Sequence, residues 1–434
     1  MNKIWNFVAE YSVLLISGAI LALIWANLAP GAYHHFVEFE LFHGGPIGHL
    51  HDDGQGHVTR SFTLHFLVND VLMAFFFAVA GKEVWEAIAL KNGSLRGKKA
   101  FTPLIATAGG MIGPVTVYLL GAAALGKFTL LANGWAIPTA TDIAFSYLVG
   151  RLVFGPGHPA IGFLLLVAIA DDAAGLVILA IFYPQGDLAP AWLLMSVLAA
   201  VGAYLLFNRL PRRLDRGRQD RPNSTWVRTK LSYWPYLAAG AISWFAFHKA
   251  GIHPALGLLP IIPAMPHAEV DYGIFAAEEA HQHDLLNEAE HKLKIPVEGI
   301  LFLFGLMNAG VEFSAVGGAT VLVLAGLLIG KPIGIWLMGS LAANTLRLGL
   351  PDGMKTTDLF VVGCVAAIGF TVSLFVASVA FPAGPVQDAA KMGALLSFAA
   401  AAMSFAAGRA LDARGTGGAP AATDSGAAGP TAAE

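Results

Sequence analysis

Two adjacent carboxylates, Asp171 and Asp172, lie in the middle of an apolar stretch that runs from Phe163 to Phe182. About 20 apolar residues are enough for one helical crossing of a bilayer. An ionised side chain at that depth costs at least about 3 kcal/mol on insertion scales. Two such residues in a row do not serve stability. We therefore expect them either to bind something that crosses the membrane or to do chemistry inside it.

Other ionisable residues also fall deep inside apolar stretches, and charges buried in a membrane normally pair or line a watery path. Neighbouring residues on a helix point about 100° apart. For this reason only one of Asp171 and Asp172 can face Lys331 squarely, and the other is expected to face an open cavity. The further deep residues are Asp70, Glu83 and Asp142.

Carboxylate oxygens are hard ligands that suit small cations, and the single cysteine, Cys364, excludes a thiolate metal site and a disulfide within the chain. A carboxylate removed from water holds protons more tightly, and a second carboxylate beside it strengthens this effect. The same oxygens can then hold either protons or a cation. This is a physical basis for exchanging one against the other.

The elements that position these residues are predicted to be membrane helices. The chain has 434 residues, of which 56% are hydrophobic and 13% charged, whereas soluble domains carry about 25% charged residues. The fold class is therefore an all-α polytopic membrane protein, with about twelve crossings by apolar run length. The predicted crossings are 11–30, 63–88, 101–124, 129–150, 158–182, 190–208, 231–248, 251–266, 295–312, 318–343, 357–381 and 389–411.

Lysine and arginine placement tests this count. With a cytoplasmic N-terminus, most of the 26 basic residues fall in cytoplasmic segments, which favours an even number of crossings and two cytoplasmic termini. The 209–230 loop holds many of them. These basic residues either only set the orientation of the chain in the membrane or also bind anionic lipids. The first apolar run is interpreted as a transmembrane helix rather than a signal peptide, because it continues to Ala29 and further crossings follow.

An internal similarity links the two halves. The motifs GGMIGPV (109–115) and GLLIGKPI (326–333) share a glycine-rich helical turn, and the crossing after each is interrupted, at 138–142 and at 369–371. Their positions in the order of crossings give them inverted topologies. Interrupted segments at matching places in two halves are the best sequence indication of a transporter's binding site. Asp142 at one break and Lys331 near the other would neutralise opposed helix ends.

Three further segments have open interpretations. The 31–61 loop contains six histidines and is a weak metal site, a short hairpin, a dimer contact or a plain solvated loop. The 266–294 loop is acidic and contains His267, His281, His283 and His291, so it either senses protons or is a solvated linker. Residues 1–412 form the transmembrane domain, and the Gly/Ala/Pro-rich residues 413–434 are expected to be a disordered cytoplasmic tail.

At these residues the sequence resembles the NhaA-type sodium/proton antiporters of bacterial inner membranes. The matches are GWAIPTATDIAF (134–145), AIADDAAGLVILAIFY (168–183), GLLIGKPIGI (326–335) and VVGCVAAIGFTVSLFVAS (361–378), and the resemblance covers about residues 11–408. It implies a twelve-helix fold with inverted repeats, for which this family is a standard example, and two broken helices, 4 and 11, that cross.

The resemblance also implies roles. Asp172 would be the principal Na⁺ or Li⁺ ligand with Asp171 beside it, and Lys331 would pair with Asp171 and release it when the cation binds. Asp142 and Thr141 would balance or line the crossing of the broken helices. Two protons would enter for each sodium extruded. No cofactor is implied, and similar proteins are often pH-activated and dimeric.

Candidates for pH sensing follow from the same resemblance. They are Glu83, Glu86, His253, Glu290 and His291. Glu83 matches the family pattern in the run from Gly81 to Ala87, whereas Trp85, Glu86 and Ala87 depart from it.

Two other functions are weighed. An intramembrane aspartyl protease needs two facing acids that share a proton, but its typical Tyr-Asp and Gly-x-Gly-Asp pairs are absent and Lys331 would quench the dyad. A proton-coupled carrier of an organic solute would need polar or aromatic groups near the breaks, and few are present. A net charge of −3 suggests no nucleic-acid partner. The favoured function is an electrogenic Na⁺(Li⁺)/H⁺ antiporter, a secondary transporter and not an enzyme.

Overall fold

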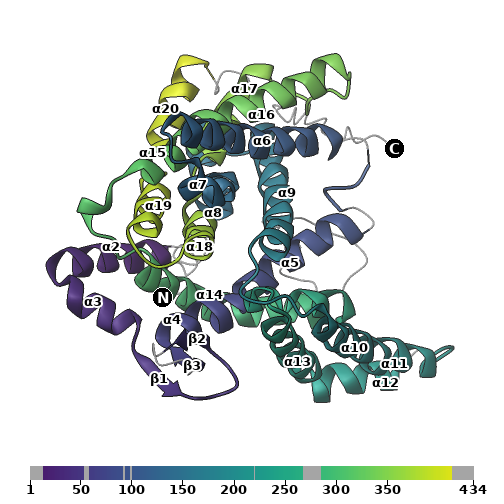
Figure 1. Cartoon of the computed structure of the whole chain (residues 1–434). Coiled ribbons are helices and arrows are strands. Elements are labelled where there is room, and N and C mark those ends of the chain that lie inside the picture. Colours follow the sequence, from purple (N-terminus) through teal and green to yellow (C-terminus); the bar gives the residue numbers. More distant parts are fainter. Residues whose placement is uncertain are drawn as a thin grey trace, which may run out of the picture.

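The protein is built from helices, with one small sheet, as the all-α prediction requires (Figure 1). The computed structural model describes residues 13–52, 58–90, 93–97, 100–218, 220–266 and 285–412. The predicted tail at 413–434 and most of the 266–294 loop lie outside these residues.

Within the described residues, six helices are long and apolar enough to cross a membrane, and one bent pair makes a seventh. The six are Leu64–Ala89, Phe101–Ala124 (α6), Pro159–Phe182 (α9), Pro190–Leu214, Gly318–Thr345 and Pro385–Ala410. The pair is Thr356–Ala366 (α17) and Phe370–Ala380 (α18), which meet at 55°. Shorter apolar helices are Val13–Leu28 (α2), Ile143–Phe154 (α8) and Pro254–Ala264. The multi-pass class is thus confirmed, and the number twelve stays a prediction.

Several long helices change their hydrogen-bonding pattern along their length. Leu64–Ala89 comprises α4 (Leu64–Phe66), η1 (Leu67–Leu72) and α5 (Met73–Ala89). Pro190–Leu214 comprises η4 (Pro190–Trp192), α10 (Leu193–Ala203), η5 (Tyr204–Arg209) and α11 (Leu210–Leu214). Gly318–Thr345 comprises α15 (Gly318–Ala325), η11 (Gly326–Gly330), α16 (Lys331–Ser340) and η12 (Leu341–Thr345), and the last span comprises α19 (Pro385–Leu396) and α20 (Ala399–Ala410). Such π-helical turns as η1 and η11 are frequent at functional sites.

The other elements complete the chain. They are α3 (Pro30–Val37), α7 (Phe128–Leu131), η3 (Ala132–Thr139), α12 (Pro222–Trp226), η6 (Val227–Leu231), α13 (Trp234–Ala250), η7 (Pro254–Leu256), η8 (Leu259–Ala264), α14 (Leu285–Asn308) and η10 (Phe313–Ala315). Helix α14 begins about ten residues before the predicted crossing at 295, so the end of the predicted loop is helical. The Glu288–Lys292 ion pair, 2.7 Å long, supports this turn because residues four apart face each other on a helix.

The 31–61 loop forms a three-stranded sheet with order β1-β3-β2, made of β1 (Glu40–His43), β2 (His49–Asp52) and β3 (Val58–Thr63). Both pairings are antiparallel. The short hairpin, one of the predicted alternatives, is therefore extended by one strand. The sheet runs directly into α4, so its position is tied to the start of that span.

The two glycine-rich motifs of the internal similarity pack against each other. A Cβ atom added at Gly334 in α16 would lie 2.0 Å from the Gly109 carbonyl oxygen in α6, and one at Gly113 would lie 2.2 Å from the Gly330 oxygen. Only glycine allows backbones to approach this closely, which is the usual role of small residues between membrane helices. The contact fixes the start of α16, where Lys331 lies.

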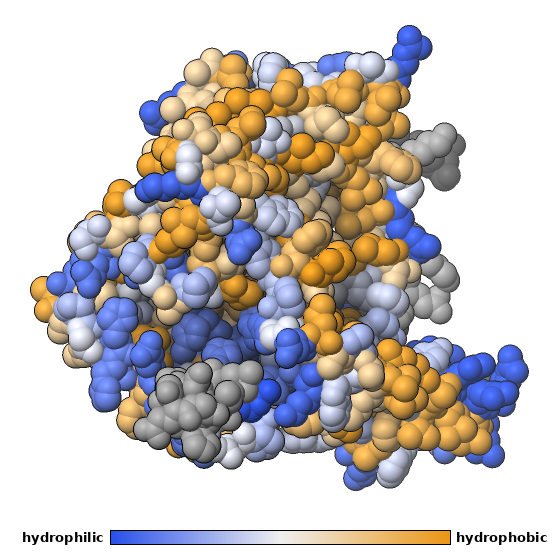
Figure 2. Space-filling model, viewed as in Figure 1, coloured by the Kyte–Doolittle hydropathy of each residue, from blue (hydrophilic) through white to orange (hydrophobic). Residues whose placement is uncertain are grey.

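The outer surface is apolar along several helices. Figure 2 shows hydrophobic residues over the lower right, where α10 and α13 lie in Figure 1, and hydrophilic residues at the far tip of that region. Leu194 and Leu198 on α10 are 63% and 62% exposed. Exposed apolar faces of this extent are what a lipid-facing surface requires.

Candidate functional site: two broken helices and a buried ion pair

The two interrupted segments meet at their breaks. Residues 140–142 separate η3 from α8, and residues 367–369 separate α17 from α18. The Asp142 amide donates to the Ile368 carbonyl over 2.7 Å, and the Thr141 hydroxyl donates to the Ala366 carbonyl over 3.1 Å. Each break therefore satisfies backbone groups of the other, which an isolated interruption in a membrane could not do.

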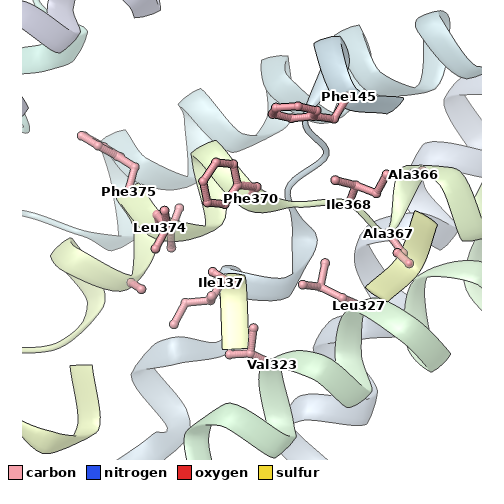
Figure 3. Close-up of a cluster of buried hydrophobic side chains, with 14 of the residues drawn as sticks. Ile137, Phe145, Val323, Leu327, Ala366, Ala367, Ile368, Phe370, Leu374 and Phe375 are labelled. Carbon is pink, nitrogen blue, oxygen red and sulfur yellow. The ribbon is translucent and has the colours of Figure 1, made fainter. Parts of the chain in front are cut away.

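Buried apolar side chains enclose this junction. Figure 3 shows Ile137, Leu327, Ile368, Phe370 and Phe145 grouped around the unwound backbone. All five are nearly or completely buried. The junction therefore lies inside protein rather than in lipid, where non-helical backbone is not tolerated.

Asp142 caps the N-terminus of α8. Its Oδ1 accepts from the Phe145 amide over 3.2 Å, and its Oδ2 accepts from the Thr371 amide over 3.4 Å and from the Thr371 hydroxyl. Asp142 thus receives donors from the first turns of both α8 and α18. Because a helix N-terminus carries partial positive charge, one carboxylate here neutralises two helix ends. Thr371 was located at the break in the sequence, but its bond to Asp142 was not predicted.

Lys331 reaches the junction from the first turn of α16. Its Nζ lies 2.6 Å from Asp171 Oδ2 and also donates to the Thr139 carbonyl. The same Asp171 oxygen accepts from the Thr141 hydroxyl over 2.7 Å, so Asp171 and the Ala366 carbonyl share one hydroxyl proton. The side chains of Lys331 and Asp171 are 0% and 2% exposed. This is a fully desolvated ion pair that joins α16, α9 and the first break.

The second carboxylate of α9 has a different environment. Asp172 is half-buried, and among the residues that the structure describes it makes no hydrogen bond or ion pair. It lies within electrostatic reach of Asp171, Asp142 and Lys331. The Oδ1 atom of Asp171 is also buried without a partner within the described part of the chain. The site therefore offers several carboxylate oxygens that are not already satisfied.

The candidate pH-sensing residues do not form one cluster. Lys82 Nζ lies 2.7 Å from Glu86, 2.7 Å from Glu290 and 3.6 Å from Glu83. Lys82 itself was not among the candidates, although a lysine four residues before an acid on a helix indicates a pair. His291 lies on α14, but its side chain is outside the described residues.

His253 lies elsewhere, near Asp70. Its Nδ1 is 3.9 Å from Asp70 Oδ1. Asp70 and Glu83 are thirteen positions apart on one helix, which is roughly 20 Å at 1.5 Å per residue. The structure thus divides the candidates between the two ends of this span.

Another buried carboxylate was missed. Glu298 on α14 is 6% exposed, and its Oε2 has no partner among the described residues. The sequence could have indicated it, because Glu298 is an acid inside the ninth predicted crossing, 295–312. Within the described residues no group of three or more His, Cys, Asp or Glu side chains could hold a resident metal. A cation at the Asp171–Asp172 pair would be cargo.

Comparisons with known proteins identify the family of the chain. The family model of Na⁺/H⁺ antiporter 1 matches residues 3–408. The chain is 69% identical over 411 residues to the Na(+)/H(+) antiporter NhaA of Jannaschia sp. (strain CCS1), covering 94% of this chain and 98% of that protein. It is 46% identical over 415 residues to the Na(+)/H(+) antiporter NhaA of Desulfitobacterium hafniense (strain DSM 10664 / DCB-2), covering 94% and 96%.

Among solved structures, the sodium proton antiporter MjNhaP1 of Methanocaldococcus jannaschii matches with a TM-score of 0.47 and 12% identity, over 96% of this chain and 100% of that one. The apolar helices, the family model and the two antiporter relatives together define a multi-pass membrane protein of the Na⁺/H⁺ antiporter class. By its family match over nearly the whole length, the chain belongs to the Na⁺/H⁺ antiporter 1 family, as the resemblance in its motifs indicated.

Proposed function

We propose that the protein is a secondary active antiporter that extrudes Na⁺ or Li⁺ in exchange for protons. The observation that carries this proposal is the buried Lys331–Asp171 pair beside a half-buried Asp172 without a bonding partner in the described chain. Oxygen ligands of this kind bind small hard cations and also protons. No cofactor is needed, because binding and release of ions is the whole reaction.

The exchange follows from competition for Asp171. In the described state Lys331 and Thr141 occupy one oxygen of Asp171. A cation that binds Asp172 and the open Oδ1 of Asp171 weakens the hold of Asp171 on Lys331, because the carboxylate charge is then shared. Lys331 and the acids lose protons as the cation enters and regain them after it leaves. Asp142 and Thr141 keep the two breaks joined around this site.

We propose a stoichiometry of two protons inward per sodium outward. This moves one net charge per cycle, and each charge is worth about 2.3 kcal/mol per 100 mV of membrane potential. The potential would then drive sodium out and support sodium and pH homeostasis. We propose the bacterial inner membrane as the location of the protein, with both termini cytoplasmic, because this orientation puts most basic residues on the cytoplasmic side. A homodimer is part of the same proposal.

Regulation by pH is part of the proposal. Glu83, Glu86 and Glu290 surround Lys82. Protonation of these acids would weaken the links between α5 and α14, and a change at that end of the molecule would report acidity to the transport site. His253 and His291 are retained as further candidates.

The test uses inverted membrane vesicles that hold a pH gradient. Addition of Na⁺ should dissipate the gradient for the parent chain and not for Asp172→Asn. Asp187→Asn is a matched control because Asp187 lies in the loop after α9, outside the site. An Asp172→Asn chain that still exchanges sodium would overturn the assignment. Raising the membrane potential should speed exchange if one net charge moves per cycle.

A further inference from the structure

The sheet of the 31–61 segment lies on the start of the α4–η1–α5 span and contacts its buried acid. The Asp70 side chain is 1% exposed, and its Oδ2 lies 3.4 Å from Nε2 of His49 on β2. His49 is half exposed, at 47%, so it connects a buried carboxylate with water. The exchange site described above does not use this pair.

The same sheet is fixed to α13. Arg60 on β3 donates to Nε2 of His248 over 3.1 Å and to the Gly48 carbonyl over 2.8 Å. Lys249 donates to the Pro46 carbonyl over 3.1 Å. The sheet therefore joins two helices that are far apart in the sequence, and any motion that separates them must loosen it.

Asp70 is incompletely satisfied. Its Oδ1 has no hydrogen-bond partner in the described residues, and the nearest base, His253 Nδ1, is 3.9 Å away and accepts from the Ala255 amide over 3.3 Å. A buried carboxylate with an open oxygen is costly unless a cation faces it. Protonated His49 is the cation that the geometry supplies.

The surroundings of His49 set the sign of its titration. Burial acts to lower the pKa of His49, but the hydrogen bond and charge of Asp70 oppose it and the pKa is raised. Other ionisable groups that face the pair come from β3, α4, α13 and the turn before η7. They are Arg60, His65, His248 and His253. Below its pKa His49 is charged and held by Asp70, and as pH rises through that value the attraction is lost.

We propose that His49 and Asp70 form a latch through which the pH on the sheet's side of the membrane controls how firmly the sheet closes over this end of the transporter. The role of the latch in controlling transport rests on the proposed antiport function, whereas the pH-dependent contact between His49 and Asp70 does not. His253 packs its ring against Phe375, with ring centroids 4.8 Å apart, and Phe375 lies one turn after Thr371, which bonds Asp142. The latch is therefore linked to α18 through Asp70, which lies 3.4 Å from His49 and 3.9 Å from His253.

The test measures closure of the sheet without measuring transport. Ser61 on β3 pairs with His49 in the strand register and is buried beneath Gly48. A Ser61→Cys reporter in a Cys364→Ala background, as a full chain in liposomes, is labelled with an impermeant maleimide. Each rate is divided by that of an exposed Ser314→Cys chain at the same pH, which removes the intrinsic reactivity of the thiol.

The relative labelling rate should rise about 3–10-fold from about pH 6 to about pH 8.5, a modest change because partial exposure screens the pair. His49→Gln and Asp70→Asn should label fast at both pH values, and His49→Arg slowly at both. The matched control is His43→Gln, since His43 lies on β1 and bonds Thr59 rather than Asp70. It should keep the parent's pH dependence.

A His49→Gln chain with the parent's pH dependence would overturn the latch. Hydrogen exchange of the β2 and β3 amides gives a second readout that needs no cysteine. Sodium-driven exchange by His49→Arg should be slowed several-fold at alkaline pH on the sheet's side. A chain that shows the labelling pattern but exchanges no sodium would contradict the proposed function and leave the latch standing. A chain that exchanges sodium but lacks the labelling pattern would contradict the latch and leave the proposed function standing.

Discussion

Lys331 and Asp171 are 160 positions apart in the sequence and 2.6 Å apart in the fold, with both side chains out of water. An ion pair buried in this way gains little net stability, because the cost of desolvating both charges offsets their attraction. Removing one partner is different, since it leaves the other charge buried and unpaired. The pair is therefore a sensitive point at which stability and ion binding are linked.

Replacing Lys331 by Ala should destabilise the protein by about 3–5 kcal/mol, the usual cost of breaking a buried pair. Thermal unfolding in detergent measures this change. The double variant Lys331→Ala/Asp171→Asn should recover most of the loss, because no unpaired charge remains. In vesicles Lys331→Ala should impair or uncouple exchange, and an unchanged dependence on membrane potential would argue against a proton-carrying lysine.

Thr141→Val should weaken the site because it removes the one hydroxyl proton that Asp171 and the Ala366 carbonyl share. A buried acceptor left without its hydrogen bond costs about 1–3 kcal/mol. We expect lower thermal stability and a higher sodium concentration for half-maximal exchange. Thr141→Ser keeps the hydroxyl and is the matched control. Equal sodium dependence of the two variants would show that Thr141 does not position Asp171.

The deep charges and the positions of the breaks were predictable because both are local signals. A carboxylate in an apolar run and a Pro-Thr-Ala-Thr-Asp sequence are visible without the fold. Which neighbour a side chain faces depends on the whole fold and not on the local sequence. The choice of Asp171 over Asp172 as the partner of Lys331 therefore came from the resemblance and not from spacing. Thr371 and Lys82 were missed as partners because a hydroxyl or a lysine does not show by itself which distant side chain it meets in the fold.

The sheet and the early start of α14 could also not be predicted from the sequence. Histidines and glycines in the 31–61 segment give no clear strand period, so a third strand had no signal. Glu288 and Lys292 are four residues apart and of opposite charge, which indicates a helix. A prediction that relies on runs of apolar residues leaves such a charged turn out. Hydropathy thus indicated the long apolar helices and underestimated α14, which extends beyond the apolar region.

Gly334→Ala should destabilise the protein by about 1–3 kcal/mol or more, as overpacking in a close contact does. The new methyl group would lie 2.0 Å from the Gly109 carbonyl oxygen, so α6 and α16 would have to separate and Lys331 would shift with them. Thermal unfolding and sodium exchange should both suffer. Gly162→Ala on α9 is the control, since nothing lies within 4 Å of its added Cβ. Similar losses in the two variants would contradict the packing argument.

Asp215 gives the protein a second pH-dependent feature, in the basic 209–230 segment. Desolvation acts to raise the pKa of Asp215, but hydrogen bonds from Ser224 and Asn223 outweigh it and lower the pKa from its ordinary value of 3.8 to about 2. The carboxylate accepts from the Asn223 amide over 3.0 Å and from the Ser224 amide over 2.7 Å. A lowered pKa means that the paired state is fully present above the unfolded value and is lost as pH falls through the folded one.

The protection of the Asn223 and Ser224 amides is the ratio of the intrinsic exchange rate at each pH to the observed rate. It should therefore stay high down to pH 3.8 and be lost as the pH falls to about 2. Asp215→Asn should expose these amides at neutral pH, because a neutral amide is a weaker acceptor than a carboxylate. Asp220→Asn is the matched control, as Asp220 is an exposed acid of the same segment. If both variants leave the amides protected at neutral pH, Asp215 does not hold α12 in place, and the turn before it must be fixed by the neighbouring helices instead.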